Sequence, residues 1–139
     1  MIKQEPKSES TTTELSAFNS YKAKKTVRIL VHEIESIPDV KSWSRQSNVS
    51  RGWLVKVMKG SYGLSPKEVL RQVRYERIVQ LLENDVEATS YSIAKDSGLS
   101  SGDALRMFLR RHHDTNFRCL RRQIINGKHQ VEWQWLGSE

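Results

Sequence analysis

Four side chains in the C-terminal third of the sequence could bind a transition metal: His112, His113, Cys119 and His129. Imidazole nitrogen and thiolate sulfur are preferred zinc ligands in proteins. Structural zinc sites, however, space these ligands as Cys-x-x-Cys pairs or as His pairs one helical turn apart, and neither spacing occurs here. We therefore expect no metal site.

The sequence also lacks the motifs of the common catalytic sites. It contains no glycine-rich phosphate loop and no Gly-x-Ser-x-Gly nucleophile turn. Cys119 is the single cysteine, and its helical setting beside Leu120 favours a packed thiol over a reactive one. We expect neither an enzyme nor a cofactor-binding protein.

Cationic side chains are the most informative chemical group. The 23 Lys and Arg residues outnumber 16 Asp and Glu, which gives a formal net charge of +7. A short basic chain carries a positive potential that attracts polyanions. No apolar run approaches the roughly 18 residues of a membrane span, and the first ten residues lack the apolar stretch of a secretion signal. We expect a cytoplasmic protein with a polyanionic partner.

Helical patterns position these cations. Residues 1–24 are rich in Ser, Thr, Lys and Glu, so we expect them to form a disordered, polar and basic arm. Ser65-Pro66-Lys67-Glu68 combines a Ser cap, an early Pro and a capping Glu, which predicts a helix from Pro66 to about Glu83. That helix is roughly 27 Å long. Further helices are predicted at about 26–37, 40–47, 50–59, 90–96, 101–112 and 117–125.

An internal repeat relates the segments before and after that long helix. Trp43-Ser44, then Asn48-Val49 and Ser50, parallel Ile93-Ala94, then Gly98-Leu99 and Ser100-Ser101. Asn and Gly at the turn accept a left-handed backbone most readily. Each copy therefore predicts a helix, a tight turn and a capped second helix. After the turn, matched spacing continues from Ser50, Leu54, Met58 and Gly63 to Ser101, Leu105, Leu109 and Asp114.

Together these features resemble the AraC/XylS-type DNA-binding domain, from about Val27 to Arg122. The shared positions include Lys56, Arg74, Leu81-Leu82, Ala104-Leu105-Arg106, Arg110-Arg111 and Leu120-Arg121. The chain departs from the family at Asp114, Phe117 and Leu99, where Gly, Pro and an aromatic residue are usual. The resemblance implies an all-α fold of about seven helices, with two homeodomain-like helix-turn-helix subdomains joined by a long connecting helix.

This resemblance gives the domain boundaries that we expect. A tandem helix-turn-helix domain would cover residues 25–125, with a first unit at 27–64, a connecting helix at 65–83 and a second unit at 89–125. Residues 126–139 would form a tail in which Val131, Trp133 and Trp135 alternate with polar residues, either as a strand or as a tail packed on the domain. We expect a stand-alone regulator that lacks a sensor domain.

In this family the second helix of each unit enters the major groove of DNA. The residues that would face the bases are Arg51, Gly52, Val55, Lys56, Gly102, Asp103, Arg106 and Met107. Lys56 and Arg106 can donate to guanine, Asp103 can accept from cytosine, and Val55 can touch a thymine methyl group. Because two of the eight are glycines, we expect modest base discrimination, with a large share of the affinity from phosphate contacts and from DNA shape.

Phosphate contacts are expected from residues at helix ends and on polar faces: Ser50, Lys59, Arg74, Arg77, Ser101, Arg110, Arg111 and Arg121. We expect His112 and His113 to join Arg110 and Arg111 on that surface. The connecting helix is comparable in length to the ~34 Å turn of B-DNA. One chain could therefore bind two adjacent grooves as a monomer.

An alternative function remains open on the sequence alone. A degenerate helix-turn-helix fold could bind RNA polymerase or another regulator and contact DNA weakly or not at all. The glycines among the base-facing positions and the aromatic Trp133 and Trp135 motivate this alternative.

Overall fold

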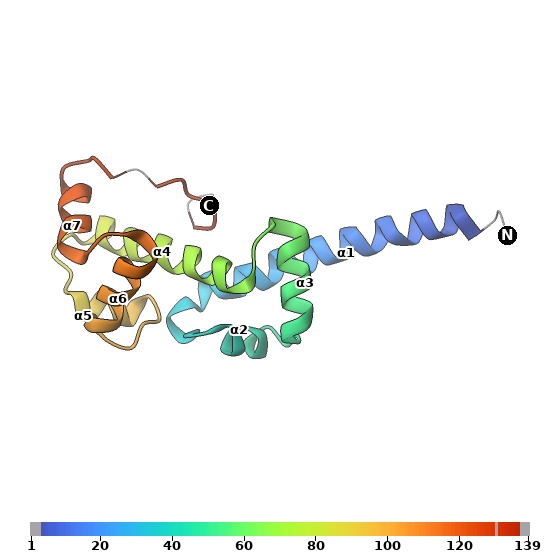
Figure 1. Ribbon diagram of the computed structural model, residues 1–139, viewed down its shortest axis with the longest axis horizontal. Coiled ribbons are helices and arrows are strands. Elements are labelled where there is room, and N and C mark those ends of the chain that lie inside the picture. Colours follow the sequence, from blue (N-terminus) through green and yellow to red (C-terminus); the bar gives the residue numbers. More distant parts are fainter. Residues whose placement is uncertain (1–3, 130, 137–139) are drawn as a thin grey trace.

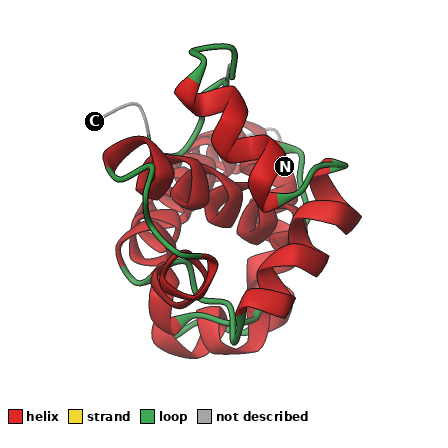
Figure 2. Ribbon diagram, turned by 90° about the vertical axis from the view of Figure 1, so that its left-hand side faces the viewer, coloured by secondary structure: helices red, strands yellow, loops and turns green. Residues whose placement is uncertain are grey.

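The protein is all-helical throughout the part that the computed structural model describes, residues 4–129 and 131–136 (Figures 1 and 2). The fold class expected from the sequence is confirmed, with seven α-helices and no strand in that part of the chain. In chain order the elements are α1 (Gln4–His32), the 3₁₀ turn η1 (Ile34–Ser36), α2 (Val40–Gln46), α3 (Arg51–Tyr62), α4 (Pro66–Asn84), α5 (Ser90–Asp96), α6 (Gly102–His113) and α7 (Phe117–Ile125).

The turn between α2 and α3 repeats the turn between α5 and α6 bond for bond. Asn48 and Gly98 both have left-handed backbones, with φ of 57° and 86°. The amide of Val49 donates to the Ser44 carbonyl at 3.0 Å, and the amide of Leu99 donates to the Ala94 carbonyl at 2.8 Å. The repeat in the sequence is therefore a repeat of backbone conformation.

Helix starts in the two units follow the same register. Asp39 and Thr89 cap α2 and α5, Ser50 and Ser101 cap α3 and α6, and Ser65 and Asn116 cap α4 and α7. Each side chain accepts a hydrogen bond from a backbone amide of the first helical turn, which satisfies a donor that the helix itself leaves free. The helices α3 and α6 also end alike, on the left-handed residues Gly63 and Asp114.

The long helix α4 carries both hydrophobic cores. Val69, Leu70 and Val73 belong to the first core, with Trp43 from α2 and Leu54 from α3. The C-terminal half of the helix supplies Ile78, Val79 and Leu82 to a second core, packed against buried residues of α5, α6 and α7. The helix has 19 residues and is therefore about 28 Å long.

The helix α1 begins far earlier than the sequence analysis expected. We expected a disordered arm over residues 1–24, whereas α1 begins at Gln4 and its N-terminal half extends beyond the domain (Figure 1); residues 1–3 lie outside the described part. The C-terminal half buries Ala23, Val27 and Leu30 in the first core. Once a helix is nucleated on the core, each further residue extends it at low cost, even in a polar segment.

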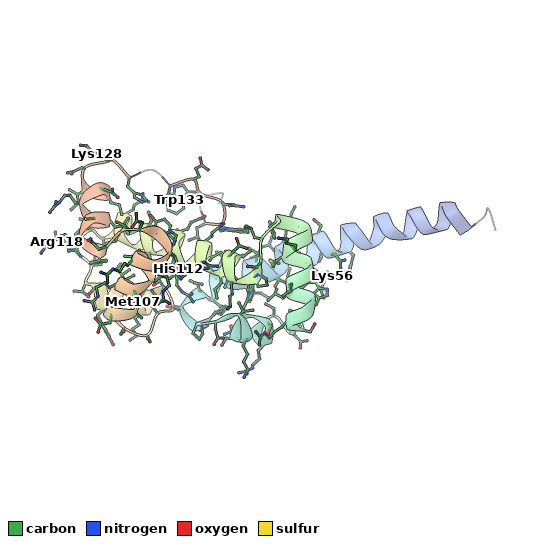
Figure 3. All side chains as sticks on the ribbon, viewed as in Figure 1. Lys56, Met107, His112, Arg118, Lys128 and Trp133 are labelled. Atoms are coloured by element: carbon green, nitrogen blue, oxygen red, sulfur yellow. The ribbon has the colours of Figure 1, made fainter. Side chains whose placement is uncertain are left out.

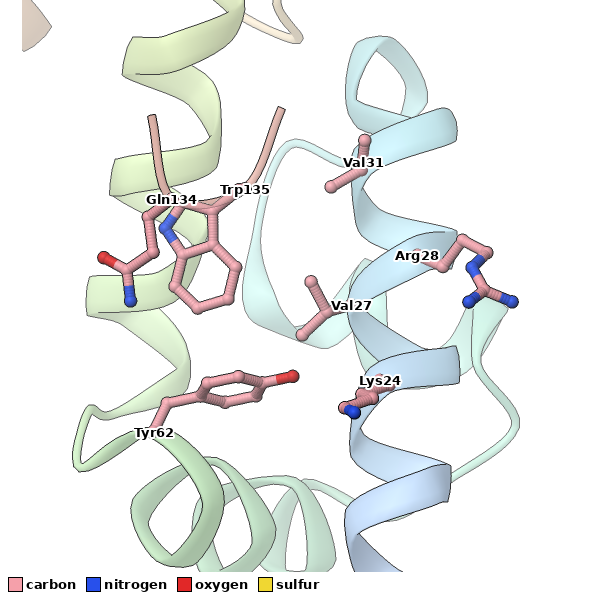
Figure 4. A pocket seen from close by; sticks show the side chains of 7 residues that line it. All are labelled: Lys24, Val27, Arg28, Val31, Tyr62, Gln134 and Trp135. Carbon is pink, nitrogen blue, oxygen red and sulfur yellow. The ribbon is translucent and has the colours of Figure 1, made fainter. Parts of the chain in front are cut away.

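The C-terminal tail packs on the domain instead of forming a strand. It runs back from α7 along α4 toward α1 (Figure 1). Trp133 is half-buried against the second core, whereas Trp135 and Leu136 are buried. The Trp135 ring meets Tyr62 edge-on, with centroids 5.0 Å apart, beside Val27 of α1 (Figure 4). The tail thus connects the second unit to the first.

Glu76 of α4 anchors this tail. Its Oε1 accepts hydrogen bonds from the amides of Trp135 at 3.0 Å and Leu136 at 2.9 Å, and its Oε2 accepts one from the amide of Gln134 at 3.0 Å. The Glu76 side chain is only 5% exposed. A buried carboxylate is stabilised when its oxygens accept several hydrogen bonds, as they do here.

Candidate nucleic-acid interface

The outer face of α3 presents the first set of predicted base-contacting residues. Arg51, Gly52 and Lys56 are exposed, and Val55 is 53% exposed. Leu54, Val57 and Met58 fill the opposite face and are buried in the first core. Because one face of α3 is buried, the opposite face is directed toward solvent. Lys56 lies on the side of α3 away from α4 (Figure 3).

The outer face of α6 presents the second set in the same register. Asp103, Arg106 and Met107 are exposed, whereas Gly102 is half-buried, with the hydroxyl of Ser90 only 3.2 Å from the position of an added Cβ. Arg106 Nη2 lies 2.9 Å from Asp103 Oδ1. Because an ion pair this exposed contributes about 1 kcal/mol or less, Arg106 can leave Asp103 at little cost.

The two faces lie near opposite ends of α4 (Figure 1). The helix α3 packs in the first core and α6 in the second, and α4 contributes to both cores. The helix α4 therefore sets the distance between α3 and α6. The helix is about 28 Å long, which is close to the ~34 Å between successive turns of one groove of B-DNA. A ligand that contacts both faces must therefore be long.

Several predicted phosphate contacts lie where a phosphate can reach them. Lys59, Arg110 and Arg111 are exposed near the C-terminal ends of α3 and α6. Ser50 and Ser101 act as N-caps, and their hydroxyl oxygens accept hydrogen bonds from the amides of Trp53 and Ala104 at 3.0 Å each. Both lie at helix N-termini, which favour anions. Arg77 is half-buried and donates to Gln80 Oε1 at 2.7 Å, so its phosphate role stays a prediction.

Arg74 differs from the expectation of a phosphate contact. Its side chain is 4% exposed, and its Nε donates to the Ser97 carbonyl at 3.0 Å while Nη2 donates to the Ile37 carbonyl at 2.6 Å. Burial lowers the pKa of Arg74 to about 10, which leaves it charged at neutral pH. The sequence contained a signal for this position, because Arg74 stands between Leu70 and Ile78 on the apolar face of α4.

Arg121 is likewise engaged within the protein. Its Nη2 donates to the Ala88 carbonyl, and its guanidinium lies 4.7 Å from the Phe117 ring centroid. This bond holds the loop before α5. Because Arg121 is half-buried and only one of its nitrogens is engaged, its phosphate contact stays a prediction. Nearby, Cys119 is exposed, which corrects the expectation of a packed thiol.

His112 and His113 do not share one phosphate-facing surface. His112 is exposed and accepts a hydrogen bond at Nδ1 from Arg71 Nη1 at 3.3 Å. His113 stacks on Tyr75 with centroids 3.7 Å apart, and burial lowers its pKa to about 4. Tyr75 also contacts His129, 2.9 Å away at Nε2. A largely neutral His113 packs as an aromatic ring.

Three further cations were missed by the sequence analysis. Lys41, Lys67 and Arg71 line a cavity between α2, α3 and α4, with His112 on its far side. No spacing rule pointed to them, because they come from separate elements and stand among many other cations. The packing of the two units alone brings them together.

Comparison of the chain with protein-family models, with curated proteins and with solved structures found no match. None of the helices in the described residues is long and apolar enough to cross a membrane. Within those same residues, no three His, Cys, Asp or Glu side chains are grouped so that they could hold a metal ion.

Proposed function

We propose that the protein is a DNA-binding transcriptional regulator, similar to the AraC/XylS type, that inserts α3 and α6 into adjacent major grooves. The observation that carries this proposal is the repeated register of the two units. Both units expose the same outer face of the second helix, and each such face carries a cation, Lys56 in α3 and Arg106 in α6. The net charge of +7 favours a polyanionic ligand.

The chemistry of the two faces predicts modest sequence preference. Lys56 and Arg106 can donate to guanine, and Val55 and Met107, 53% and 45% exposed, offer apolar contact to thymine methyl groups. Asp103 accepts from Arg106 in the free protein and repels nearby phosphates. Much of the affinity would then come from the backbone contacts and from DNA shape. One chain carries both faces, so a monomer suffices, acting at the bacterial nucleoid.

A titration with duplex DNA at several salt concentrations tests this function. Log affinity should fall linearly with log salt, because cations released from the duplex drive binding. Lys56→Ala and Arg106→Ala should each weaken binding, whereas Lys128→Ala removes the same charge from the opposite side of the second unit to Met107 (Figure 3) and should have little effect. Absence of binding at low salt would contradict the proposal.

A second candidate function follows from α1. Phe18 and Tyr21 of α1, which precede the buried Ala23, are 56% and 64% exposed. Aromatic residues left on a surface are typical of protein-binding sites. The chain could therefore act on RNA polymerase or another regulator, with or without DNA. Phe18→Ser with Tyr21→Ser would abolish such a complex while leaving the DNA titration unchanged.

A further inference from the structure

A cavity of about 620 Å³ lies where the first unit, α4 and the second unit meet. The first unit supplies Pro38 to Lys41 and Arg51, α4 supplies Lys67, Leu70 and Arg71, and the second unit supplies His112. This volume lies within the range of small-ligand sites, roughly 300 to 1,000 Å³. An occupant would touch both units at once.

The charge in this cavity is strongly unbalanced. Four cations line it, namely Lys41, Arg51, Lys67 and Arg71, against the single carboxylate of Asp39. Asp39 already accepts a hydrogen bond from the amide of Ser42 at 2.8 Å as the cap of α2. In the described part of the chain no carboxylate lies within 4.0 Å of any of these four cations. An anion would therefore find charged donors that no carboxylate occupies.

His112 responds to the same positive field. Its pKa is lowered by burial and by the nearby charges of Arg71 and Arg111. The imidazole accepts from Arg71 at Nδ1, so it holds that guanidinium at the edge of the cavity. Apolar Pro38, Val40 and Leu70 complete the lining. Cationic and apolar groups side by side fit a phosphate attached to a sugar ring.

We propose that this cavity binds a sugar phosphate, with Lys41, Lys67 and Arg71 around the phosphate and the apolar residues against the sugar. Two sources share this chemistry, the DNA backbone between the two grooves and a free mononucleotide. The first source rests on the proposed DNA-binding function, and the second does not. In either case the occupant would contact both units.

Side-chain signals in ¹H–¹⁵N spectra of the full chain can test this proposal. The signals to follow are Arg71 Nε–H and the His112 imidazole, during separate titrations with thymidine monophosphate, with thymidine and with a short duplex. The test variant is Lys41→Gln with Lys67→Gln. The control variant, Lys95→Gln with Lys128→Gln, loses the same charge from exposed sites outside the cavity.

Saturable shifts with thymidine monophosphate but not with thymidine support a free ligand, and shifts with the duplex alone support the DNA backbone. In both cases the test variant should bind about tenfold more weakly and the control variant almost normally. Shifts with the nucleotide in a chain that fails to bind duplex would refute the DNA-binding function and keep this site. Unshifted signals in all titrations, or equal weakening of both variants, would overturn the proposal.

Discussion

Arg74 joins the two helix-turn-helix units through its hydrogen bond to the carbonyl of Ser97. The same guanidinium also donates to the Ile37 carbonyl. One side chain on α4 therefore provides hydrogen bonds to a carbonyl in the turn of the second unit and to a carbonyl in the loop before α2 of the first unit. Ser97 and Ile37 are themselves fully buried. The relative position of the two units is therefore fixed by a buried polar contact as well as by α4.

Arg74→Met should destabilise the protein by about 3 kcal/mol, because two buried carbonyls lose a charged donor. Urea denaturation followed by circular dichroism measures this change. Lys67→Met on the same helix is the control, since Lys67 is exposed. Equal free energies of unfolding for the two variants would show that Arg74 does not hold the units together.

Gly98→Ala should be among the most damaging small substitutions in the chain. The new Cβ would lie 2.3 Å from the Ile34 carbonyl oxygen, on a residue whose φ is +86°. Ile34 belongs to the first unit, so the clash would open the contact between the units. Gly52→Ala meets nothing within 4 Å and should stabilise α3 by up to about 1 kcal/mol. Thermal melts of the two variants should shift in opposite directions.

Glu76→Gln should lower the melting temperature, because an amide NH₂ would face backbone amides that now donate to a carboxylate oxygen. The cost is about 1–3 kcal/mol, whereas Glu83→Gln replaces an exposed carboxylate and should change little. Truncation after Asn126 should also lower the melting temperature. In the truncated chain Glu76→Gln should have almost no further effect, since its partners are gone. If the two changes lowered the melting temperature additively, Glu76 would not act through its hydrogen bonds to the tail.

Acid should destabilise the protein through His113. The pKa of His113 is about 4 in the folded chain and about 6.5 when unfolded. Above pH 6.5 the ring is neutral in both the folded and the unfolded state, and its contribution to the stability of the fold is fully present. As pH falls from 6.5 toward 4, the unfolded chain binds a proton that the folded chain does not, so stability falls.

The variant His113→Phe keeps an aromatic ring against Tyr75 but cannot bind a proton. Its melting temperature should therefore fall less than that of the wild type between pH 7 and pH 5. Parallel pH dependence in the two proteins would assign the acid effect to other groups, such as His112 and His129, whose pKa values burial also lowers.

Local sequence signals predicted the helices and the repeat well. Ser65, Pro66 and Glu68 predicted the start of α4, and the capping box is present, with both hydrogen bonds between Ser65 and Glu68. Asn48 and Gly98 predicted the two turns because a left-handed backbone restricts residue type. The exposed positions of Lys56 and Arg106 followed from the apolar period of the second helices.

Contacts across long stretches of sequence escaped prediction. Arg74 and Arg121 were predicted to bind phosphates, yet both donate to backbone carbonyls far away in the chain. Every residue has a backbone carbonyl that could accept such a hydrogen bond. The sequence therefore does not show which carbonyl an arginine will contact. Glu76 was missed for the same reason: the backbone amides that donate hydrogen bonds to it are 58 to 60 residues away in the sequence.

A hydroxyl-radical footprint on a selected DNA site tests the central proposal most directly. We expect a monomer to protect two segments on one face, centred about 10 base pairs apart. Lys56→Ala should weaken protection in one segment and Arg106→Ala in the other, whereas Lys128→Ala should weaken neither. A single protected segment, or the same segment lost in both variants, would contradict binding through two helix-turn-helix units.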